Sequence, residues 1–284
     1  MNAETRRARS VVSAAPTAPV AAERIGRDGT RTPISEAVAE EVPVALVFNG
    51  VSHAVMMATP TDLEDFGLGF ALTEGIIARR EELYDVESES VSGGIEVRLS
   101  ISQERFAGLR ERRRSLTGRT GCGICGVDSL QHAIKPVTPV GSGKRFTTDA
   151  LHRALAELPA QQEINRVTHS VHAAAWSDEA GRIQLIREDV GRHNALDKLI
   201  GAMAWQRADP NDGFAVITSR CSVEMVQKAV AAGISVLTAI SAPTALAQRI
   251  ATESGLTLVA LARADSLLLL THPQRILSTL REGA

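Results

Sequence analysis

The chain has 284 residues, of which 44% are hydrophobic and 23% charged, so it can bury the core of one large domain or of two unequal ones. Its formal net charge of -2 excludes a general attraction to nucleic acid or to an anionic membrane, so any anion must be bound by local groups. Three cysteines are too few for a secreted disulfide framework, which favours a reducing compartment and predicts a cytoplasmic protein.

The first 30 residues predict a disordered tail. They hold the doublet Arg6-Arg7 and then a weakly hydrophobic stretch with two prolines, Val11–Ala22. A twin-arginine export signal is the alternative, although this stretch is a poor hydrophobic region for a signal peptide. No stretch elsewhere has the roughly 20 apolar residues of a membrane span.

Residues 31–145 predict a smaller N-terminal α+β module that ends in a cysteine-bearing loop. Asn49-Gly50 favours a tight turn between two apolar runs, and a capping box closed by Glu64 favours a helix start. The predicted elements are a hairpin over Glu41–Met57, a helix from Thr61 to near Ala78, and an alternating strand over Ile95–Ile101, after which a linker follows.

This linker is very basic and ends in a pair of cysteines. Residues 103–120 run directly into the glycine-rich sequence Gly121–Gly126, which contains Cys122 and Cys125. Read alone, such a charge run indicates a solvated helix face. Its arginines are Arg105, Arg110, Arg112, Arg113, Arg114 and Arg119.

The spacing of Cys122 and Cys125 leaves several chemistries open. A closed zinc site would need two more ligands, and His132 is the only nearby imidazole in the sequence. A thioredoxin-like pair would lie at a strand-to-helix turn, whereas the glycines here indicate an exposed loop, and an iron–sulfur cluster would need more cysteines. A persulfide carrier fits better, because nearby arginines favour the thiolate and a second thiol can expel the sulfide.

From residue 146 to the end, the pattern predicts an α/β domain with three layers, α/β/α. Residues 134–147 hold two prolines and two glycines and predict the connector to it. Its strands are apolar without alternation, as expected where helices cover both faces of a sheet. The predicted strands are Val167–Trp176, Arg182–Arg187, Gly213–Thr218, Ile234–Ile240 and Leu256–Ala262, and the predicted helices are Arg192–Trp205, Val223–Ala232 and Thr244–Ser254.

Candidate ligand-binding residues follow the strands of this domain, where the next helix presents free N–H groups. Hydroxyls and arginines there suit a phosphate and a purine, although Ser and Thr are also expected at helix starts simply as caps. His193 beside Arg192 is a further candidate for a phosphate or a neighbouring subunit, with a capping or core imidazole as the alternative. The loop candidates are Ser219, Arg220, Ser241, Thr244 and the segment Arg263–Ser266.

Several long motifs in matching order resemble the formate dehydrogenase accessory sulfurtransferase family, FdhD. The resemblance continues through Ser219–Ser222 and Ser241–Thr244 to Thr271-His272 and covers nearly everything after residue 30. The motifs are Glu41–Leu46, Thr61–Ile77, Arg119–Gly126 and Glu188–Lys198.

The resemblance implies that the chain takes sulfur from a cysteine desulfurase as a persulfide. It would pass that sulfur to the molybdenum bis-guanine-dinucleotide cofactor before the cofactor enters formate dehydrogenase. Cys122 stands at the family's persulfide position and Cys125 is its partner. The resemblance also implies a homodimer and a C-terminal domain similar to the cytidine-deaminase fold. It places the cofactor, for which GDP is a surrogate, at Leu261, Ala262, Arg263, Ala264, Asp265 and Ser266.

Two other functions stay open on the residues alone. A zinc nucleoside deaminase would need H-x-E and P-C-x-x-C motifs in the α/β domain, whereas no H-x-E occurs and Cys221 stands alone there. A lone Cys221 is better explained as a packing residue. The second is a cofactor chaperone, which would bind the cofactor without sulfur chemistry. It differs from a sulfur carrier only in that its thiols carry no sulfur.

Overall fold

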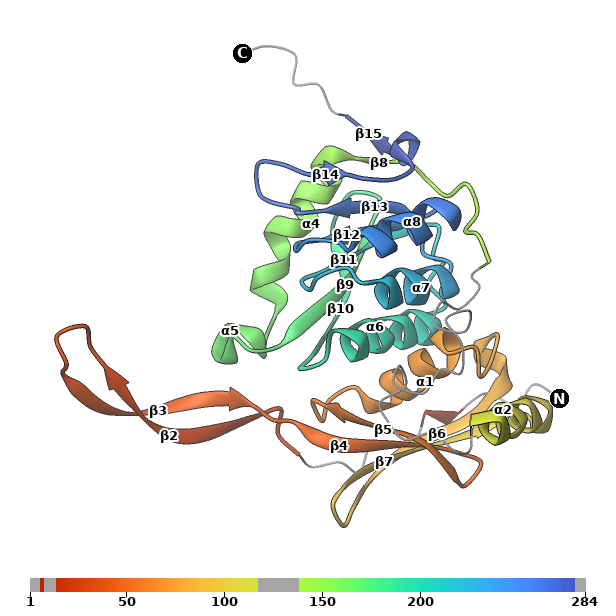
Figure 1. Cartoon of the computed structure of the whole chain (residues 1–284), viewed down its shortest axis with the longest axis horizontal. Coiled ribbons are helices and arrows are strands. Elements are labelled where there is room, and N and C mark those ends of the chain that lie inside the picture. The colour runs from red at the N-terminus through yellow and green to blue at the C-terminus, as the bar shows by residue number, and fades with distance from the viewer. Residues whose placement is uncertain (1–5, 8–13, 117–137, 279–284) are drawn as a thin grey trace.

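The computed structural model describes residues 6–7, 14–116 and 138–278, which form two α/β units and a projecting arm (Figure 1). In this part of the chain, no helix is long and apolar enough to cross a lipid bilayer.

The N-terminal unit is a five-stranded sheet in the order β1-β6-β7-β4-β5, with α1 packed on one face. The hairpin predicted around Asn49-Gly50 is confirmed, and both residues have the positive φ, 45° and 79°, that a tight hairpin turn requires. The elements are β1 (Arg6–Arg7), β4 (Val42–Phe48), β5 (Val51–Ala58), α1 (Leu63–Thr73), a 3-10 turn at Arg80–Glu82, β6 (Leu83–Val91), β7 (Gly94–Ile101) and α2 (Gln103–Leu116).

Helix α1 is shorter than predicted at both ends. It begins at Leu63, and the residue before it, Asp62, has a left-handed φ of 52° and makes no side-chain cap. The predicted capping box is therefore wrong, and the Glu64 carboxylate instead accepts a hydrogen bond from the Ser88 hydroxyl at 2.5 Å. The helix ends before Gly75, whose φ of 64° stops it well short of residue 78. The basic stretch predicted as a linker begins with α2.

Two long strands that precede β4 form the arm that projects from the N-terminal unit (Figure 1). β2 (Thr17–Ile25) pairs antiparallel with β3 (Arg31–Ala39) along its whole length. The sequence predicts a disordered tail over residues 1–30, and for the residues of β2 that prediction is wrong. Weakly apolar residues become a strand here because β3 supplies a hydrogen-bonding partner, which composition alone does not reveal.

The C-terminal unit is a six-stranded mixed sheet in the order β10-β9-β11-β12-β13-β14. The predicted strand Val167–Trp176 begins only at His172, because Asn165–Thr168 form the short helix α5. The other predicted elements of this unit are found with ends shifted by at most two residues. The elements are β8 (Phe146–Thr147), α4 (Thr148–Gln161), β9 (His172–Asp178), β10 (Ile183–Asp189), α6 (Arg192–Gln206), β11 (Gly213–Ile217), α7 (Val223–Ala231), β12 (Val236–Ala239), α8 (Ala245–Glu253), β13 (Thr257–Ala260), β14 (Leu268–Leu269), a 3-10 turn at Pro273–Arg275 and β15 (Ile276–Leu277).

Helices cover both faces of this sheet, which gives three layers (Figure 1). α6, α7 and α8 pack on one face, where Leu199 and Val226 belong to the core. α4 packs on the other, where Leu151 meets Phe214 and Val236. The likeness to the cytidine-deaminase fold stays a prediction. Because the buried clusters draw on residues 44–109 in one unit and 146–260 in the other, we propose the domain boundary between residues 145 and 146.

Helices α1 and α6 join the two units through a close contact at two glycines. A Cβ atom on Gly69 would lie 1.7 Å from the carbonyl oxygen of Asp197, and one on Gly201 would lie 1.9 Å from that of Asp65. The two backbones therefore approach more closely than any side chain permits. Glycine at these positions determines how the two units dock.

We expect Gly69→Ala to lower the free energy of unfolding by about 3 kcal/mol, because the added methyl group forces α1 and α6 apart. Urea unfolding followed by circular dichroism measures the change. Gly108→Ala on α2 is the matched control, since its Cβ would meet nothing within 4 Å and should stabilise the helix by about 0.5–1 kcal/mol. Equal effects of the two substitutions would contradict this account of the contact.

Candidate functional site

The predicted loops of the C-terminal unit meet at one edge of its sheet. β10, β11, β12 and β13 run in the same direction, because β9 is antiparallel to both β10 and β11 while the other pairs are parallel. The loops that follow β11, β12 and β13 are linked by backbone hydrogen bonds. The N–H of Thr244 donates to the Cys221 carbonyl at 3.0 Å, and the N–H of Leu261 donates to the Ser241 carbonyl at 3.2 Å. The structure therefore brings these predicted residues together.

Two of the predicted hydroxyls are used within the fold. Thr244 caps α8, and its hydroxyl accepts the N–H of Ala247 at 3.1 Å. The Ser219 side chain is buried and donates to the carbonyl of Arg220 at 3.1 Å. For Thr244 the capping interpretation of the sequence is confirmed, and the exposed neighbour Arg220 is better placed to meet a ligand.

The segment Leu261–Ser266 forms a rim beyond β13 that is exposed except at Ala262, which is buried and so is not placed to meet a ligand. The N–H of Arg263 donates to the carbonyl of Ser266 at 2.8 Å, which closes the segment into a turn. The Arg263 guanidinium donates to the carbonyls of Ile240 and Ala262, so the turn is held against the loop after β12. Leu261 has a φ of 47° and is 39% exposed, a strained arrangement for a bulky residue of the kind that gathers at binding sites.

Arg192 and His193 begin α6 at the same edge. The Nε2 atom of His193 lies 4.0 Å from the Glu224 carboxylate of α7, so the first turns of the two helices are neighbours. In the described part of the chain, the buried Nε atom of Arg192 and the Nε2 atom of His193 have no hydrogen-bond partner. Burial, together with the positive charges of Arg192 and Lys228, lowers the pKa of His193 from 6.5 to about 4. The edge therefore offers a permanent cation, a neutral imidazole and helix N–H groups to an anion.

The lowered pKa of His193 predicts a loss of stability in acid. In the unfolded chain the imidazole of this residue binds a proton near pH 6.5, whereas in the folded chain it does so only near pH 4. The contribution of the neutral imidazole to the free energy of unfolding is therefore full above pH 6.5 and is lost as the pH falls. We expect this residue to lower the free energy of unfolding by about 2 kcal/mol between pH 7 and pH 5. Urea unfolding at both pH values measures it, and His193→Gln should reduce the difference by that amount. An unchanged difference would contradict the shift.

The cysteine pair lies outside the described residues, as does His132. Cys221 is fully buried in the core beside α6 and α7, and burial raises the pKa of its thiol to about 12. Its interpretation as a packing residue is confirmed. Over residues 6–7, 14–116 and 138–278, no three His, Cys, Asp or Glu side chains are grouped so as to hold a metal ion.

The motif Glu188–Lys198 builds a buried polar network between the two units, a role that the sequence analysis missed. The Lys198 ammonium and the Asp189 carboxylate are fully buried, 2.6 Å apart. Lys198 also donates to the Thr59 carbonyl at 2.9 Å, while the Thr59 N–H donates to Asp189 at 3.0 Å. Asn194 donates to a carbonyl of β5 at 2.8 Å. The motif therefore fastens the end of β5 to the C-terminal unit.

A second buried group extends this network along α6. Lys228 of α7 donates to both carboxylate oxygens of Asp197, at 2.9 and 2.8 Å, and to Thr73 of α1 at 3.0 Å. Arg187 of β10 pairs with Asp65 of α1 at 2.7 Å. This network could have been inferred from the sequence, because charged residues occur inside α6, a helix that is otherwise apolar on every side. Charged residues in such a helix indicate buried partners.

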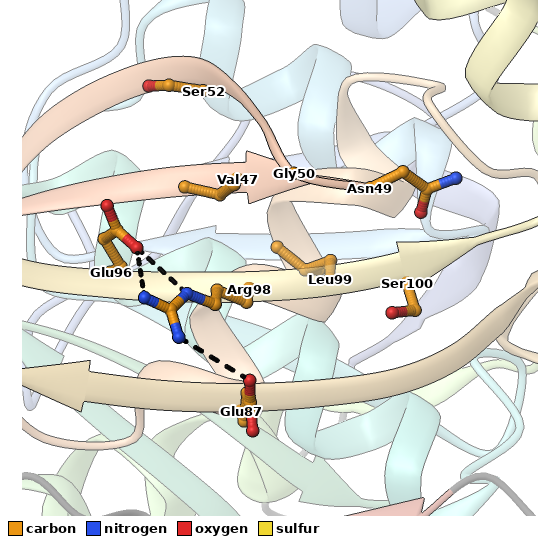
Figure 2. A pocket seen from close by; sticks show the side chains of 9 residues that line it. All are labelled: Val47, Asn49, Gly50, Ser52, Glu87, Glu96, Arg98, Leu99 and Ser100. Atoms are coloured by element: carbon orange, nitrogen blue, oxygen red, sulfur yellow. Dashed lines mark hydrogen bonds and ion pairs between the residues drawn. The ribbon is translucent and has the colours of Figure 1, made fainter.

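A hollow of about 370 Å³ lies on the outer face of the N-terminal sheet (Figure 2). Arg98 crosses it and donates to Glu96 at 2.9 and 2.8 Å, and Glu87 lies on its other side at 3.9 Å. None of the predicted site residues lines it. The lining residues are Val47, Asn49, Gly50, Ser52, Glu87, Glu96, Arg98, Leu99 and Ser100.

Comparison with known proteins shows where the chain belongs. The model of the FdhD/NarQ family matches residues 39–277. The sulfur carrier protein FdhD of Cupriavidus necator is 52% identical over 239 residues, which cover 84% of this chain and 83% of that protein. The protein of the same name from Xanthomonas euvesicatoria pv. vesicatoria is 50% identical over 250 residues, 88% of this chain and 89% of that protein.

A solved structure agrees with these relatives. The crystal structure of a proposed formate dehydrogenase accessory protein from Desulfotalea psychrophila matches the fold with a TM-score of 0.73 at 26% identity, and the match covers 93% of this chain and 100% of that one. With a family model matched over most of its length and relatives half identical to it, the chain belongs to the FdhD/NarQ family.

Proposed function

We propose that this chain is a cytoplasmic sulfurtransferase that supports formate dehydrogenase. It would take sulfur from a cysteine desulfurase as a persulfide and deliver it to the molybdenum bis-guanine-dinucleotide cofactor, its cargo, working as a homodimer. The observation that carries the proposal is the thiol pair Cys122 and Cys125 in a chain whose relatives are named sulfur carrier proteins.

The proposed transfer needs no reactant besides the desulfurase persulfide and the two thiols until the disulfide that it leaves is reduced. The Cys122 thiolate attacks the outer sulfur of the desulfurase persulfide and releases the desulfurase thiolate, which leaves a persulfide on Cys122. The Cys125 thiolate then attacks the inner sulfur, so that hydrosulfide leaves and a Cys122–Cys125 disulfide forms. A dithiol reductant must return two electrons before the next cycle.

The edge of the C-terminal sheet supports the other half of the proposal, the binding of the cofactor. Its exposed arginines, Arg220 and Arg263, and the first turn of α6 suit the phosphates of a guanine dinucleotide. Leu261, held exposed at the rim, would offer an apolar surface to a base. The same features would equally serve a chaperone that binds the cofactor without sulfur chemistry. An experiment on the thiols is therefore needed to distinguish the two functions.

Mass spectrometry after incubation with a cysteine desulfurase and cysteine tests the proposal. We expect the peptide that spans Cys122 and Cys125 to gain the mass of one sulfur atom. The Cys221 peptide is the internal control and should stay unmodified, because its thiol is buried and protonated at neutral pH. If formate dehydrogenase is activated while no sulfur appears on the Cys122 peptide, the chaperone function replaces the carrier.

We expect Arg263→Ala to weaken the binding of GDP about tenfold, because a charged hydrogen bond to phosphate is lost and the turn is no longer held to the loop after β12. Isothermal titration calorimetry measures the affinity. Arg182→Ala is the matched control, since this exposed arginine lies in the β9–β10 turn at the opposite edge of the sheet and pairs with nearby Asp178. Unchanged affinity in Arg263→Ala would remove this residue from the site.

A further inference from the structure

Arg80 and Trp205 meet where the end of α6 touches the N-terminal unit. The Cζ atom of Arg80 lies 5.3 Å from the centre of the Trp205 ring, which packs on the core of that unit. In the described part of the chain, the buried Nε atom of Arg80 and the buried Nε1 atom of Trp205 have no hydrogen-bond partner. The terminal nitrogens of Arg80 reach the surface, so the ring holds a guanidinium whose donors the fold does not use.

Helix α2 is fastened beside this pair, at the side of β6 (Figure 1). Glu82, in the same 3-10 turn as Arg80, accepts hydrogen bonds from the Arg105 guanidinium at 2.9 and 3.0 Å. Leu109 packs the helix on the core of the N-terminal unit. Arg110 follows directly, is exposed, and forms no ion pair with any residue that the structure describes. The first half of α2 is therefore anchored, and its next residue turns a free cation to solvent.

Positive charge is in excess over these two neighbouring segments, residues 79–82 and 103–116, which we call the arginine face. They hold seven arginines and four glutamates, whereas the whole chain has a net charge of -2. One of the four glutamates, Glu82, is already neutralised by Arg105. A local excess of this kind attracts an acidic surface and guides its approach, even on a chain that is slightly negative overall.

The arginine face lies near the thiols along the chain and away from the candidate edge of the C-terminal sheet. Cys122 follows the last residue of α2 by six residues, which span at most about 20–22 Å in any conformation. The candidate edge is at the other end of α6, a helix of 15 residues that is about 22 Å long. A partner bound at the arginine face could therefore reach the thiols while the edge stays open to the cofactor.

We propose that the arginine face is the docking surface for the protein that donates the persulfide, and that it binds an acidic segment of that protein. The inference rests on the sulfur transfer proposed above and names where the donor binds. A guanidinium donates two parallel hydrogen bonds to a carboxylate, so arginines suit an acidic segment better than lysines do. Arg80 is held ready for such a contact by Trp205, and these two residue types supply much of the binding energy at protein interfaces.

The rate of persulfide transfer from a cysteine desulfurase to the full chain tests the inference, with mass spectrometry of the Cys122 peptide as the readout. We expect the double variant Arg80→Glu with Arg110→Glu to lower the second-order rate constant at least tenfold and to leave the rate at saturating desulfurase unchanged, because docking is lost and chemistry is kept. Arg80→Lys keeps the charge and should lose no more than about threefold. Added salt should slow the wild-type chain and not the double variant.

Arg153→Glu is the matched control, since this exposed arginine of α4 lies on the other unit, and its rate should equal that of the wild-type chain. Inorganic polysulfide is a second control, a small donor that needs no docking. The Cys122 thiolate takes one sulfur from it and releases the shortened polysulfide, at a rate that should be equal in the wild-type chain and the double variant.

The outcomes separate the two proposals. Equal desulfurase rates in the wild-type chain and the double variant would overturn the docking surface alone. An equal loss with polysulfide, or a loss of GDP affinity in the double variant, would also overturn it, because the arginines would then serve the thiols or the cofactor. A wild-type chain that takes no sulfur from the desulfurase would overturn sulfur transfer and the docking surface together.

Discussion

Replacing Cys122 with alanine should abolish the activation of formate dehydrogenase by this chain. No thiolate would remain at the position proposed to carry the persulfide, and Cys125 would have no sulfur to expel. The same variant should keep the free energy of unfolding and the GDP affinity of the wild-type chain, since cofactor binding is proposed for the C-terminal unit. Formate dehydrogenase activity in cells that carry only the variant is the measurement.

Cys221→Ala is the matched thiol control for this experiment. It removes the one cysteine that the structure buries in the core, whose pKa is raised to about 12 by burial, so it can affect stability but not sulfur transfer. We expect activation to persist in that variant. Full activation by Cys122→Ala would overturn the sulfur-carrier function and leave the cofactor chaperone.

Replacing Lys198 with methionine should lower the free energy of unfolding by about 3–5 kcal/mol. The side chains are similar in length, but the substitution leaves the fully buried Asp189 carboxylate without its counter-charge at 2.6 Å. It also removes the hydrogen bond to the Thr59 carbonyl, which links the two units. Guanidinium unfolding followed by circular dichroism measures the loss.

The control for Lys198 is a lysine that pairs on the surface. Lys144 lies 2.9 Å from Asp212 with 47% of its side chain exposed, and Lys144→Met should change stability by less than about 1 kcal/mol. A double variant in which Asp189→Leu accompanies Lys198→Met should recover part of the loss, because no unpaired charge remains. If the two single lysine variants lose equal stability, the buried pair does not hold the units together.

Local patterns predicted those parts of the fold that depend on neighbouring residues. The Asn49-Gly50 hairpin was predictable because φ above zero is needed at both turn positions. The apolar strands of the C-terminal unit were predictable because helices cover both their faces. The capping box at Thr61 failed because Glu64 is drawn into a hydrogen bond with Ser88 of β6, a residue that becomes its neighbour only in the folded unit.

The candidate site was predictable in outline and not in detail. The rule that ligands bind at the ends of parallel strands predicted that the loops of Ser241, Thr244 and Arg263 would lie close together, and hydrogen bonds link these loops. The rule could not predict that Thr244 caps a helix or that Arg263 holds the rim. Whether a hydroxyl or a guanidinium bonds to the backbone or to a ligand depends on distances of a few ångströms, which only the folded structure sets.

The sequence by itself determined the thiol pair at Cys122 and Cys125, the α/β alternation and the motifs of the family, because each depends on residues close together in the chain. Only the tertiary structure decided that the motif Glu188–Lys198 fastens two units and that residues 17–39 form an arm. The hydrogen bond from Thr59 to Asp189 spans 130 residues. Such a partner can be identified only when two backbones are docked, and a buried charge is stable only once that partner is in place.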